Sequence, residues 1–174
     1  MYGVILFGKP GSGKSSIGKG MAKVYGYKYI SSGDIARDLA KSDSKIGELL
    51  NAGGMAPEPI MRSMVRHAIS ECISNDQCFI LDGFPRYDYQ DEYLCDMFPN
   101  LAIIRVLIDV DDSTAIKRCR GRGREDEGAT MTRLDYYHKN TEKLTETCSI
   151  TIDNNADTYT TLIMKLEAEV HECL

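Results

Sequence analysis

The sequence lacks several features that would define other classes of protein. No apolar run approaches the length that spans a membrane, and the first residues do not have the organisation of a signal peptide. The six cysteines are scattered without a C-x-x-C pair, so neither a zinc site nor a disulfide framework is indicated. Repeats, low-complexity tracts and interdomain linkers are absent as well. The 174 residues are therefore predicted to form one domain, residues 1–174, in a reducing cytoplasm.

The net charge and the apolar pattern argue against several kinds of macromolecular partner. The net charge of −5 argues against non-specific binding to nucleic acid or to an acidic membrane surface. No large apolar surface stripe is left over after the helical faces are assigned to a core, so a monomer is expected. The partners that remain are small molecules.

Short apolar strands alternate with segments of helical periodicity along the chain, which predicts a parallel sheet with helices on both faces. The run 103–108 is nearly all apolar, as expected for a strand that is covered on both faces. The expected fold class is α/β with a five-stranded sheet. Strands are expected at 2–7, 27–30, 78–81, 102–108 and 149–152. Helices are expected at about 15–25, 33–41, 44–52, 58–74, 88–97, 112–120, 130–146 and 157–172.

Residues 8–15, Gly-Lys-Pro-Gly-Ser-Gly-Lys-Ser, match the phosphate-binding pattern G-x-x-x-x-G-K-[ST] without a deviation. An apolar strand precedes this loop and a helical segment follows it, as the chemistry requires. Backbone N–H groups and the helix dipole supply positive potential to a phosphate. Lys14 is expected to reach the β- and γ-phosphates, and the Ser15 hydroxyl is expected to ligate Mg²⁺. The loop predicts binding of a nucleoside triphosphate by Gly8, Pro10, Gly11, Ser12, Gly13, Lys14, Ser15 and Ser16.

The third predicted strand ends in Asp-Gly-Phe-Pro-Arg, residues 82–86. Asp82 stands where a protein with a phosphate-binding loop holds Mg²⁺ through water. Arg86 follows on a stiff Gly–Pro turn that suits a guanidinium aimed into a cleft, and its planar fork can bind phosphate bidentately. A magnesium-holding carboxylate and a phosphate-binding arginine are therefore predicted beside the loop.

Two insertions interrupt the alternation of strands and helices. Residues 31–59 contain helices but no strand, and residues 120–128 carry Arg120, Arg122 and Arg124 among glycines. Both insertions follow the carboxyl ends of strands, where ligands bind in open α/β sheets, so both are predicted to be mobile covers. Transfer of a phosphoryl group needs positioning and electrostatic stabilisation rather than covalent chemistry. The pattern of loop and arginines favours such an enzyme.

These segments, taken in order along nearly the whole chain, resemble the nucleoside monophosphate kinases, and adenylate kinase in particular. The segments are 8–15, 32–37, 82–86 and the block from Arg118 to Arg133. The resemblance implies reversible phosphoryl transfer from Mg·ATP to AMP, which gives two ADP. It also implies that residues 31–59 bind the nucleoside monophosphate and that residues 121–132 form a short lid without room for a zinc knuckle.

The resemblance implies roles for the residues of the acceptor site. Arg37 and Arg86 would hold the α-phosphate of the acceptor, and Lys14 would follow the transferring phosphoryl group. Gln90 matches the glutamine that reads the adenine of AMP, whereas similar kinases for UMP or CMP carry asparagine; a kinase for these acceptors remains the alternative. The implied acceptor site comprises Ser32, Gly33, Arg37, Met55, Ala56, Gly83, Phe84, Arg86, Gln90 and Arg133.

The resemblance also implies roles on the ATP side. Arg118 would flank the ATP base and Arg122 would contact phosphates, while Asn155 stands near the expected adenine contacts. The implied catalytic residues are Lys14, Arg86, Arg122, Arg124 and Arg133.

Some positions depart from the family pattern. Ser32 replaces a threonine, which keeps the hydroxyl and loses a methyl contact to the base. The 31–59 insertion and the lid are both short, and Glu127 replaces an aspartate of the lid. The register of Arg122 and Arg124, and the part played by Arg120, therefore stay open. None of these departures removes a charge that the reaction needs.

Three rival functions are less well supported. A kinase for a small non-nucleotide hydroxyl would not need the motif at 82–86 or the insertion. A GTPase-type switch needs Asn-Lys-x-Asp, which the sequence lacks. A binding-only relative is disfavoured because Lys14, Ser15, Asp82 and Arg86 are all present.

Overall fold

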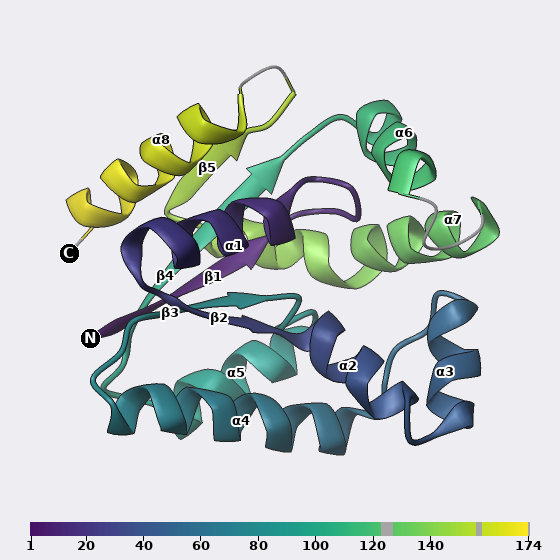
Figure 1. Cartoon of the computed structure of the whole chain (residues 1–174), viewed down its shortest axis with the longest axis horizontal. Helices are drawn as coiled ribbons and strands as arrows, with labels where there is room; N and C mark the ends of the chain where they lie inside the picture. Colours follow the sequence, from purple (N-terminus) through teal and green to yellow (C-terminus); the bar gives the residue numbers. More distant parts are fainter. Residues whose placement is uncertain (123–126, 156–157, 174) are drawn as a thin grey trace.

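A computed structural model describes residues 1–122, 127–155 and 158–173 of the chain. Its centre is a five-stranded sheet in the order β2-β3-β1-β4-β5, and all neighbouring strands are parallel (Figure 1). The predicted α/β class and the five-stranded parallel sheet are confirmed. The strands are β1 (Tyr2–Phe7), β2 (Lys28–Ser31), β3 (Phe79–Asp82), β4 (Ala102–Asp109) and β5 (Ile150–Asp153).

Strands β2, β3 and β5 begin and end one residue later than predicted, and each ends on a polar residue. Ser31 pairs with Asp82, and Asp109 pairs with Asp153, within the parallel ladders. A ladder uses backbone N–H and C=O groups, so a polar side chain at a strand end joins it as readily as an apolar one. The shift places Ser31 and Asp82 side by side at the carboxyl edge of the sheet.

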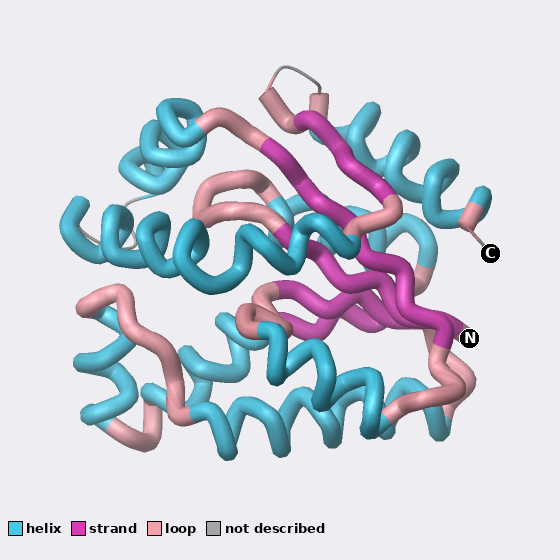
Figure 2. Tube along the Cα trace, turned by 180° about the vertical axis from the view of Figure 1, so that it is seen from behind, coloured by secondary structure: helices cyan, strands magenta, loops and turns pink. Residues whose placement is uncertain are grey.

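Helices cover both faces of the sheet (Figures 1 and 2). One face carries α1 (Lys14–Tyr25) and α8 (Tyr159–Glu172), and the other carries α4 (Glu58–Ser74) and α5 (Asp88–Met97). No helix in the described ranges is long and apolar enough to cross a membrane. The six cysteines are free thiols; Cys72 and Cys119 are buried, whereas others are partly or fully exposed.

Two hydrophobic cores follow from the alternation of side chains along β1. Val4 and Leu6 belong to the core under α1 and α8, and Ile5 and Phe7 belong to the core under α4 and α5. All four side chains are at most 2% exposed. A strand that is buried on both faces has a continuous apolar sequence, as β1 does. The phosphate-binding loop therefore leaves the sheet from a central strand.

The two predicted covers lie beyond the carboxyl edge of the sheet. The first contains α2 (Ser32–Ala40) and α3 (Ser44–Asn51), and the second is flanked by α6 (Asp112–Arg122) and α7 (Glu127–Tyr136). In Figure 1, α3 and α7 lie on the same side of the molecule. The tip of the predicted lid, residues 123–126, lies outside the described residues.

The single helix predicted at 130–146 is wrong. Helix α7 ends at Tyr136, and a π-helix (Tyr137–Thr141) and a 3₁₀-helix (Glu142–Thr147) follow it. Side chains in this segment donate hydrogen bonds to backbone carbonyls: Asn140 to Tyr136, Thr145 to Glu142, and Thr147 to Leu144. Such bonds compete with regular helix geometry. The π-helix adjoins the cavity at the carboxyl edge of the sheet. Such turns occur frequently at functional sites.

Candidate active site

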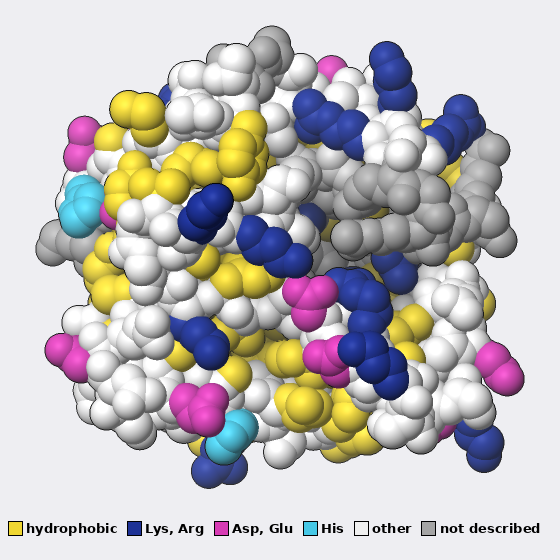
Figure 3. Space-filling view, viewed as in Figure 1, with side chains coloured by type: hydrophobic (Ala, Val, Ile, Leu, Met, Phe, Trp, Pro, Cys, Tyr) yellow, Lys and Arg dark blue, Asp and Glu magenta, His cyan; other side chains and the backbone are white. Residues whose placement is uncertain are grey.

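A cavity of about 660 Å³ lies at the carboxyl edge of the sheet. The phosphate-binding loop, α2, the segment before α4, the turn after β3, and the end of α7 line it. Its lining includes the basic residues Lys14, Arg37, Arg86 and Arg133. Lys and Arg side chains gather around the hollow on this face of the molecule (Figure 3). The cavity is therefore suited to an anionic ligand.

The phosphate-binding loop has the backbone that its glycines permit. Gly11 and Gly13 have φ angles of 83° and 96°, and a Cβ atom at Gly11 would lie 2.3 Å from the carbonyl oxygen of Ala115. Gly13 is the N-cap of α1, and no described side chain caps the first turn of this helix. Its N–H groups therefore remain available to a phosphate at the positive end of the helix dipole.

Lys14 folds back over the loop. Its Nζ donates to the carbonyl oxygens of Gly8 and Lys9, the latter at 3.0 Å, and to the Ser12 hydroxyl at 3.4 Å. These acceptors are neutral, so a phosphate oxygen in the cavity would be a stronger partner for the ammonium group. The side chain is already beside the place where a phosphate would bind.

An asparagine that the sequence analysis missed supports the loop. Asn154 is 8% exposed, and its Nδ2 donates to the carbonyl oxygen of Ser12 at 2.7 Å. Arg118 donates in turn to the carbonyl oxygen of Asn154 at 2.8 Å. The predicted residue Asn155 instead accepts from the Asp111 N–H at 3.1 Å and donates to Asp153. Neither Arg118 nor Asn155 lines the cavity, and their predicted roles stay predictions.

Asp82 is the polar centre of the floor of the cavity. The hydroxyls of Ser15 and Tyr29 both donate to its Oδ2, each at 2.6 Å, and Asp82 is 5% exposed. Burial, and then the neighbouring Asp82 charge, raise the pKa of the Tyr29 phenol, which stays a donor. The pair of Ser15 and Asp82 places a hydroxyl and a carboxylate beside the phosphate-binding loop.

This oxygen pair fits Mg²⁺. Magnesium keeps several waters and is bound by one or two protein oxygens together with substrate phosphates. Within the described residues, no group of three His, Cys, Asp or Glu side chains could hold a metal ion by itself. A site of one hydroxyl and one carboxylate beside a phosphate-binding loop is therefore consistent with a magnesium–nucleotide complex.

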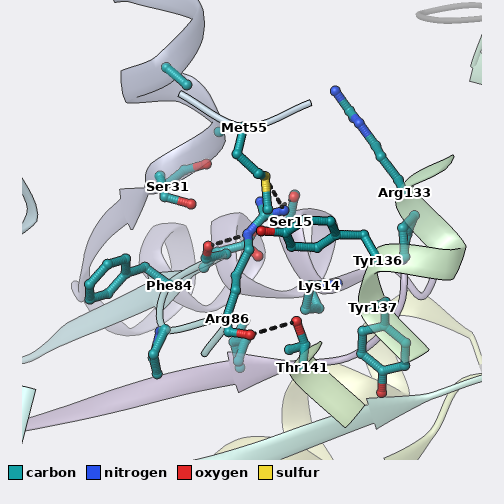
Figure 4. Close-up of a pocket in the computed structure, with 18 of the residues that line it drawn as sticks. Lys14, Ser15, Ser31, Met55, Phe84, Arg86, Arg133, Tyr136, Tyr137 and Thr141 are labelled. Atoms are coloured by element: carbon teal, nitrogen blue, oxygen red, sulfur yellow. Dashed lines mark hydrogen bonds between the residues drawn. The ribbon is translucent and has the colours of Figure 1, made fainter. Parts of the chain in front are cut away.

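Arg86 lies at the centre of the cavity wall, between Met55 and Thr141 (Figure 4). Its Nε donates to the carbonyl oxygen of Gly83 at 2.7 Å, and its Nη1 donates to Met55 Sδ at 3.1 Å. The Thr141 hydroxyl donates to the Arg86 carbonyl oxygen at 3.1 Å. Burial lowers the pKa of Arg86 to about 10. The guanidinium is thus fixed and charged near neutral pH.

Gln90 is 6% exposed and closes the turn that carries Arg86. Its Oε1 accepts the backbone N–H of Arg86 at 2.8 Å. Gln90 also lines the cavity. The structure places every predicted acceptor residue in the lining: Ser32, Gly33, Arg37, Met55, Ala56, Gly83, Phe84, Arg86, Gln90 and Arg133.

The other predicted acceptor arginine, Arg37, is half-exposed and pairs with Asp34, its Nη2 lying 2.5 Å from Asp34 Oδ1. Partial burial of Asp34 opposes the effect of this pair, but the hydrogen bond and charge of Arg37 outweigh it and lower the pKa of Asp34. Arg133 of α7 donates to the carbonyl oxygen of Leu50 in α3 at 3.4 Å. This contact joins the first predicted cover to α7, just after the predicted lid.

The remaining predicted residues divide into two groups. Gly8, Pro10, Ser12 and Ser16 line the cavity with the rest of the loop. Arg124 and the side chain of Arg122 lie outside the described residues.

Three tyrosines of the lining, Tyr87, Tyr89 and Tyr136, were not among the predicted site residues. Tyr87 stacks on Tyr89 with ring centroids 4.9 Å apart, and it meets the edge of Tyr136 at 5.6 Å. The sequence signal was a Tyr-x-Tyr directly after Arg86 and a Tyr-Tyr pair at 136–137. Pairing them required knowledge that α7 ends beside the turn after β3.

The parallel α/β sheet, the loop at the carboxyl end of β1 and the helix that begins at Lys14 define a P-loop nucleotide-binding protein. Comparison with known families narrows this class. The adenylate kinase family model matches residues 6–151. The chain belongs to the adenylate kinase family.

Individual relatives agree with this assignment. An adenylate kinase of Ureaplasma parvum serovar 3 is 39% identical over 124 residues, which cover 68% of this chain and 57% of the relative. An adenylate kinase of Borreliella burgdorferi is 36% identical, covering 69% of this chain and 57% of the relative. One from Pseudarthrobacter chlorophenolicus is 31% identical over 156 residues, covering 82% and 80%. The chain thus spans little more than half the length of the first two relatives.

Proposed function

We propose that this chain catalyses reversible phosphoryl transfer between Mg·ATP and AMP, which gives two ADP. The observation that carries the proposal is that one cavity is lined both by the phosphate-binding loop and by Arg37 and Arg86, the arginines predicted to hold the acceptor. A protein that only binds or hydrolyses a triphosphate has no need of the second set. Similarity to relatives named adenylate kinase supports the same reaction.

In the proposed mechanism, the loop N–H groups and Lys14 hold the donor phosphates and follow the transferred group. Arg86 holds the α-phosphate of AMP in line with the γ-phosphate of ATP, and Arg37 contributes a second contact. Catalysis then comes from positioning and charge stabilisation. No general base is required, because the attacking oxygen of AMP is already ionised.

Ser15, directly, and Asp82, through water, would hold Mg²⁺. The ion would neutralise charge on the β- and γ-phosphate oxygens. Ser15 already donates its hydroxyl proton to Asp82, so its lone pairs are available for a cation. Asp82 would keep its negative charge at the floor of the cavity.

We further propose that residues 31–59 and the short lid, residues 121–132, close over the two nucleotides and exclude water, which would otherwise accept the phosphoryl group. Arg122 and Arg124 would then join the phosphates, with Arg133 at the hinge. Arg118 and Asn155 would lie toward the ATP base. A monomeric state, a cytoplasmic location and the absence of nucleic-acid, membrane and zinc partners stay predictions.

The proposal is tested by a coupled assay of ADP formation with saturating Mg·ATP and AMP, CMP, UMP or dTMP as acceptor. AMP is expected to give the highest kcat/KM, and the reaction without an acceptor should be slow. If UMP or CMP is the better acceptor, the assignment of Gln90 to adenine is wrong and the alternative kinase is correct. If no acceptor raises the rate above hydrolysis, the proposed activity is wrong.

A further inference from the structure

The phenol of Tyr29 contacts the proposed magnesium carboxylate but has no role in the reaction described above. We infer that Tyr29 is a positioning residue, which fixes the Asp82 carboxylate so that Oδ1 faces the hydrated cation. The inference rests on the proposed binding of a magnesium–nucleotide complex.

The sheet register explains how Tyr29 reaches Asp82. Ser31 of β2 is the ladder partner of Asp82 in β3, and Tyr29 precedes Ser31 by two residues on the same strand. Residues two apart point to the same face of a sheet and are about 6.6 Å apart along the strand. The long tyrosine side chain covers this separation and puts its hydroxyl 2.6 Å from Asp82 Oδ2. A shorter residue at position 29 would not reach the carboxylate.

Helix α1 makes room for this side chain at Gly18. A Cβ atom at Gly18 would lie 2.7 Å from Cε2 of the Tyr29 ring. Gly18 is inside a helix, where glycine is less favourable than alanine. Close approach of the Tyr29 ring accounts for a glycine at this position. Gly18 and Tyr29 therefore form a matched pair.

Both donors to Asp82 use the same oxygen. Ser15 and Tyr29 donate to Oδ2, and no donor from the described part of the chain contacts Oδ1. The carboxylate is held by one oxygen, and the other remains for metal-bound water. Tyr29 is also a neutral donor, so it orients the carboxylate without cancelling the charge that attracts a divalent cation. A lysine or arginine in the same place would cancel it.

Outer-shell partners of this kind affect metal affinity even though they do not touch the metal. A purely structural role for Tyr29, filling the space over Gly18, would make the ring important and the hydroxyl unimportant. The Tyr29→Phe variant separates these roles, because it keeps the ring and removes the hydroxyl. Tyr27→Phe is the matched control: it also removes a phenol hydroxyl that donates to a carboxylate, but that carboxylate is Glu167, at 3.1 Å, and not Asp82.

The test measures Mn²⁺ binding to the protein–ATP complex by electron paramagnetic resonance, and ATP binding in EDTA by calorimetry. Tyr29→Phe is expected to weaken Mn²⁺ binding about tenfold and to leave metal-free ATP binding unchanged. Tyr27→Phe is expected to leave Mn²⁺ binding at the wild-type value. Wild-type Mn²⁺ affinity in Tyr29→Phe would overturn the inference. An equal loss of metal-free ATP affinity would also overturn it, because the loop rather than the carboxylate would then depend on Tyr29.

A second variant tests the matched pair. Gly18→Ala should displace the Tyr29 ring and weaken Mn²⁺ binding, and it should have little further effect when it is combined with Tyr29→Phe, because both changes remove one contact. Additive losses would contradict the pairing. A wild-type protein that binds Mn²⁺ and ATP but does not phosphorylate AMP would contradict the proposed activity and leave this inference standing. A wild-type complex that binds no Mn²⁺ would overturn the inference itself.

Discussion

The two predicted acceptor arginines lie on one cavity but are held in different ways. Arg86 is partly buried, and its guanidinium contacts the Gly83 carbonyl oxygen and the Met55 sulfur. Within the described residues it forms no salt bridge, although the charge of Asp82 is close enough to act on it. Arg37 is half-exposed, and the carboxylate of Asp34 already pairs with it. A phosphate that reaches Arg86 meets a guanidinium with no carboxylate bound to it, whereas a phosphate that reaches Arg37 must compete with Asp34.

The two arginines therefore differ in how firmly their positions are fixed. The turn that holds Arg86 is fixed by Gln90 from one side and by Thr141 from the other. Arg37 is on α2, inside the predicted mobile cover, and binding of a phosphate there would exchange one anionic partner for another. We therefore expect Arg86 to stabilise the transition state and Arg37 to contribute mainly to acceptor binding.

The largest effect is expected for Arg86→Lys. Lysine keeps a charge but cannot form the planar fork that holds two oxygens and the Gly83 carbonyl at once. The expected loss in kcat/KM for AMP is about 3 kcal/mol, or roughly a hundredfold, with most of it in kcat. Steady-state kinetics at saturating Mg·ATP measure this loss. A rate near that of wild type would remove Arg86 from the catalytic residues.

Arg37→Lys is the matched comparison. A lysine at this half-exposed site can still extend to the phosphate of the acceptor. The expected loss in kcat/KM is therefore about tenfold and appears mainly in KM for AMP. If both lysine variants lose the same factor in kcat, the distinction between the two arginines is wrong.

Asp34→Asn tests the competition directly. Removal of the carboxylate leaves Arg37 without its anionic partner and removes a negative charge beside the phosphate. KM for AMP is expected to fall about two- to threefold with kcat little changed. Asp38→Asn is the control, because Asp38 is on the same helix and pairs with Lys41 instead. A rise in KM for Asp34→Asn alone would mean that Asp34 positions Arg37 rather than competing for it.

The sequence was sufficient for those parts of the site that depend on local chemistry. The loop needs glycines with positive φ, a strand before it and a helix after it, and all of these are written within residues 2–25. Asp82 and Arg86 follow from the end of one strand and one stiff turn. Contacts between segments that are distant in the chain could not be predicted from the sequence. Asn154 and Asn155 are adjacent amides, and only the path of the folded chain decides which one reaches Ser12.

The break in the helix after Tyr136 was hidden for a related reason. Its apolar spacing is compatible with one helix, while the side-chain hydrogen bonds that unwind it involve Thr and Asn residues that are ordinary on a helix surface. Tyr29 was assigned to a strand but gave no sign of its partner, because strand order cannot be read from a single strand.

The contacts that support Arg86 continue from Thr141 through the π-helix to α6 and the phosphate-binding loop. Thr141, which holds the Arg86 carbonyl, ends the π-helix, and His138 in the same turn lies 3.0 Å from Glu142 and 3.3 Å from Asp112. Asp112 also pairs with Lys9 of the phosphate-binding loop at 2.7 Å. The ring of Tyr137 meets the imidazole edge-on. Protonated His138 therefore ties α6 and the 3₁₀-helix to the turn beneath Arg86.

The smallest effect is expected when the contacts of protonated His138 with Glu142 and Asp112 are lost. The hydrogen bond that His138 donates to Glu142, and then the Glu142 and Asp112 charges, raise the pKa of His138 above its ordinary value. A raised pKa stabilises the folded state fully below about pH 6.5, the pKa of an unperturbed histidine, and the stabilisation is lost as the pH rises through the folded-state pKa. His138→Gln should therefore lower Tm by about 1–2 °C at pH 5.5 and by less at pH 8.5. His67→Gln, at an exposed histidine of α4 beside Glu71, is the control for loss of an imidazole on a helix surface. A deficit for His138→Gln that stays constant from pH 5.5 to 8.5 would show that packing of the imidazole, rather than its charge, supports the turn.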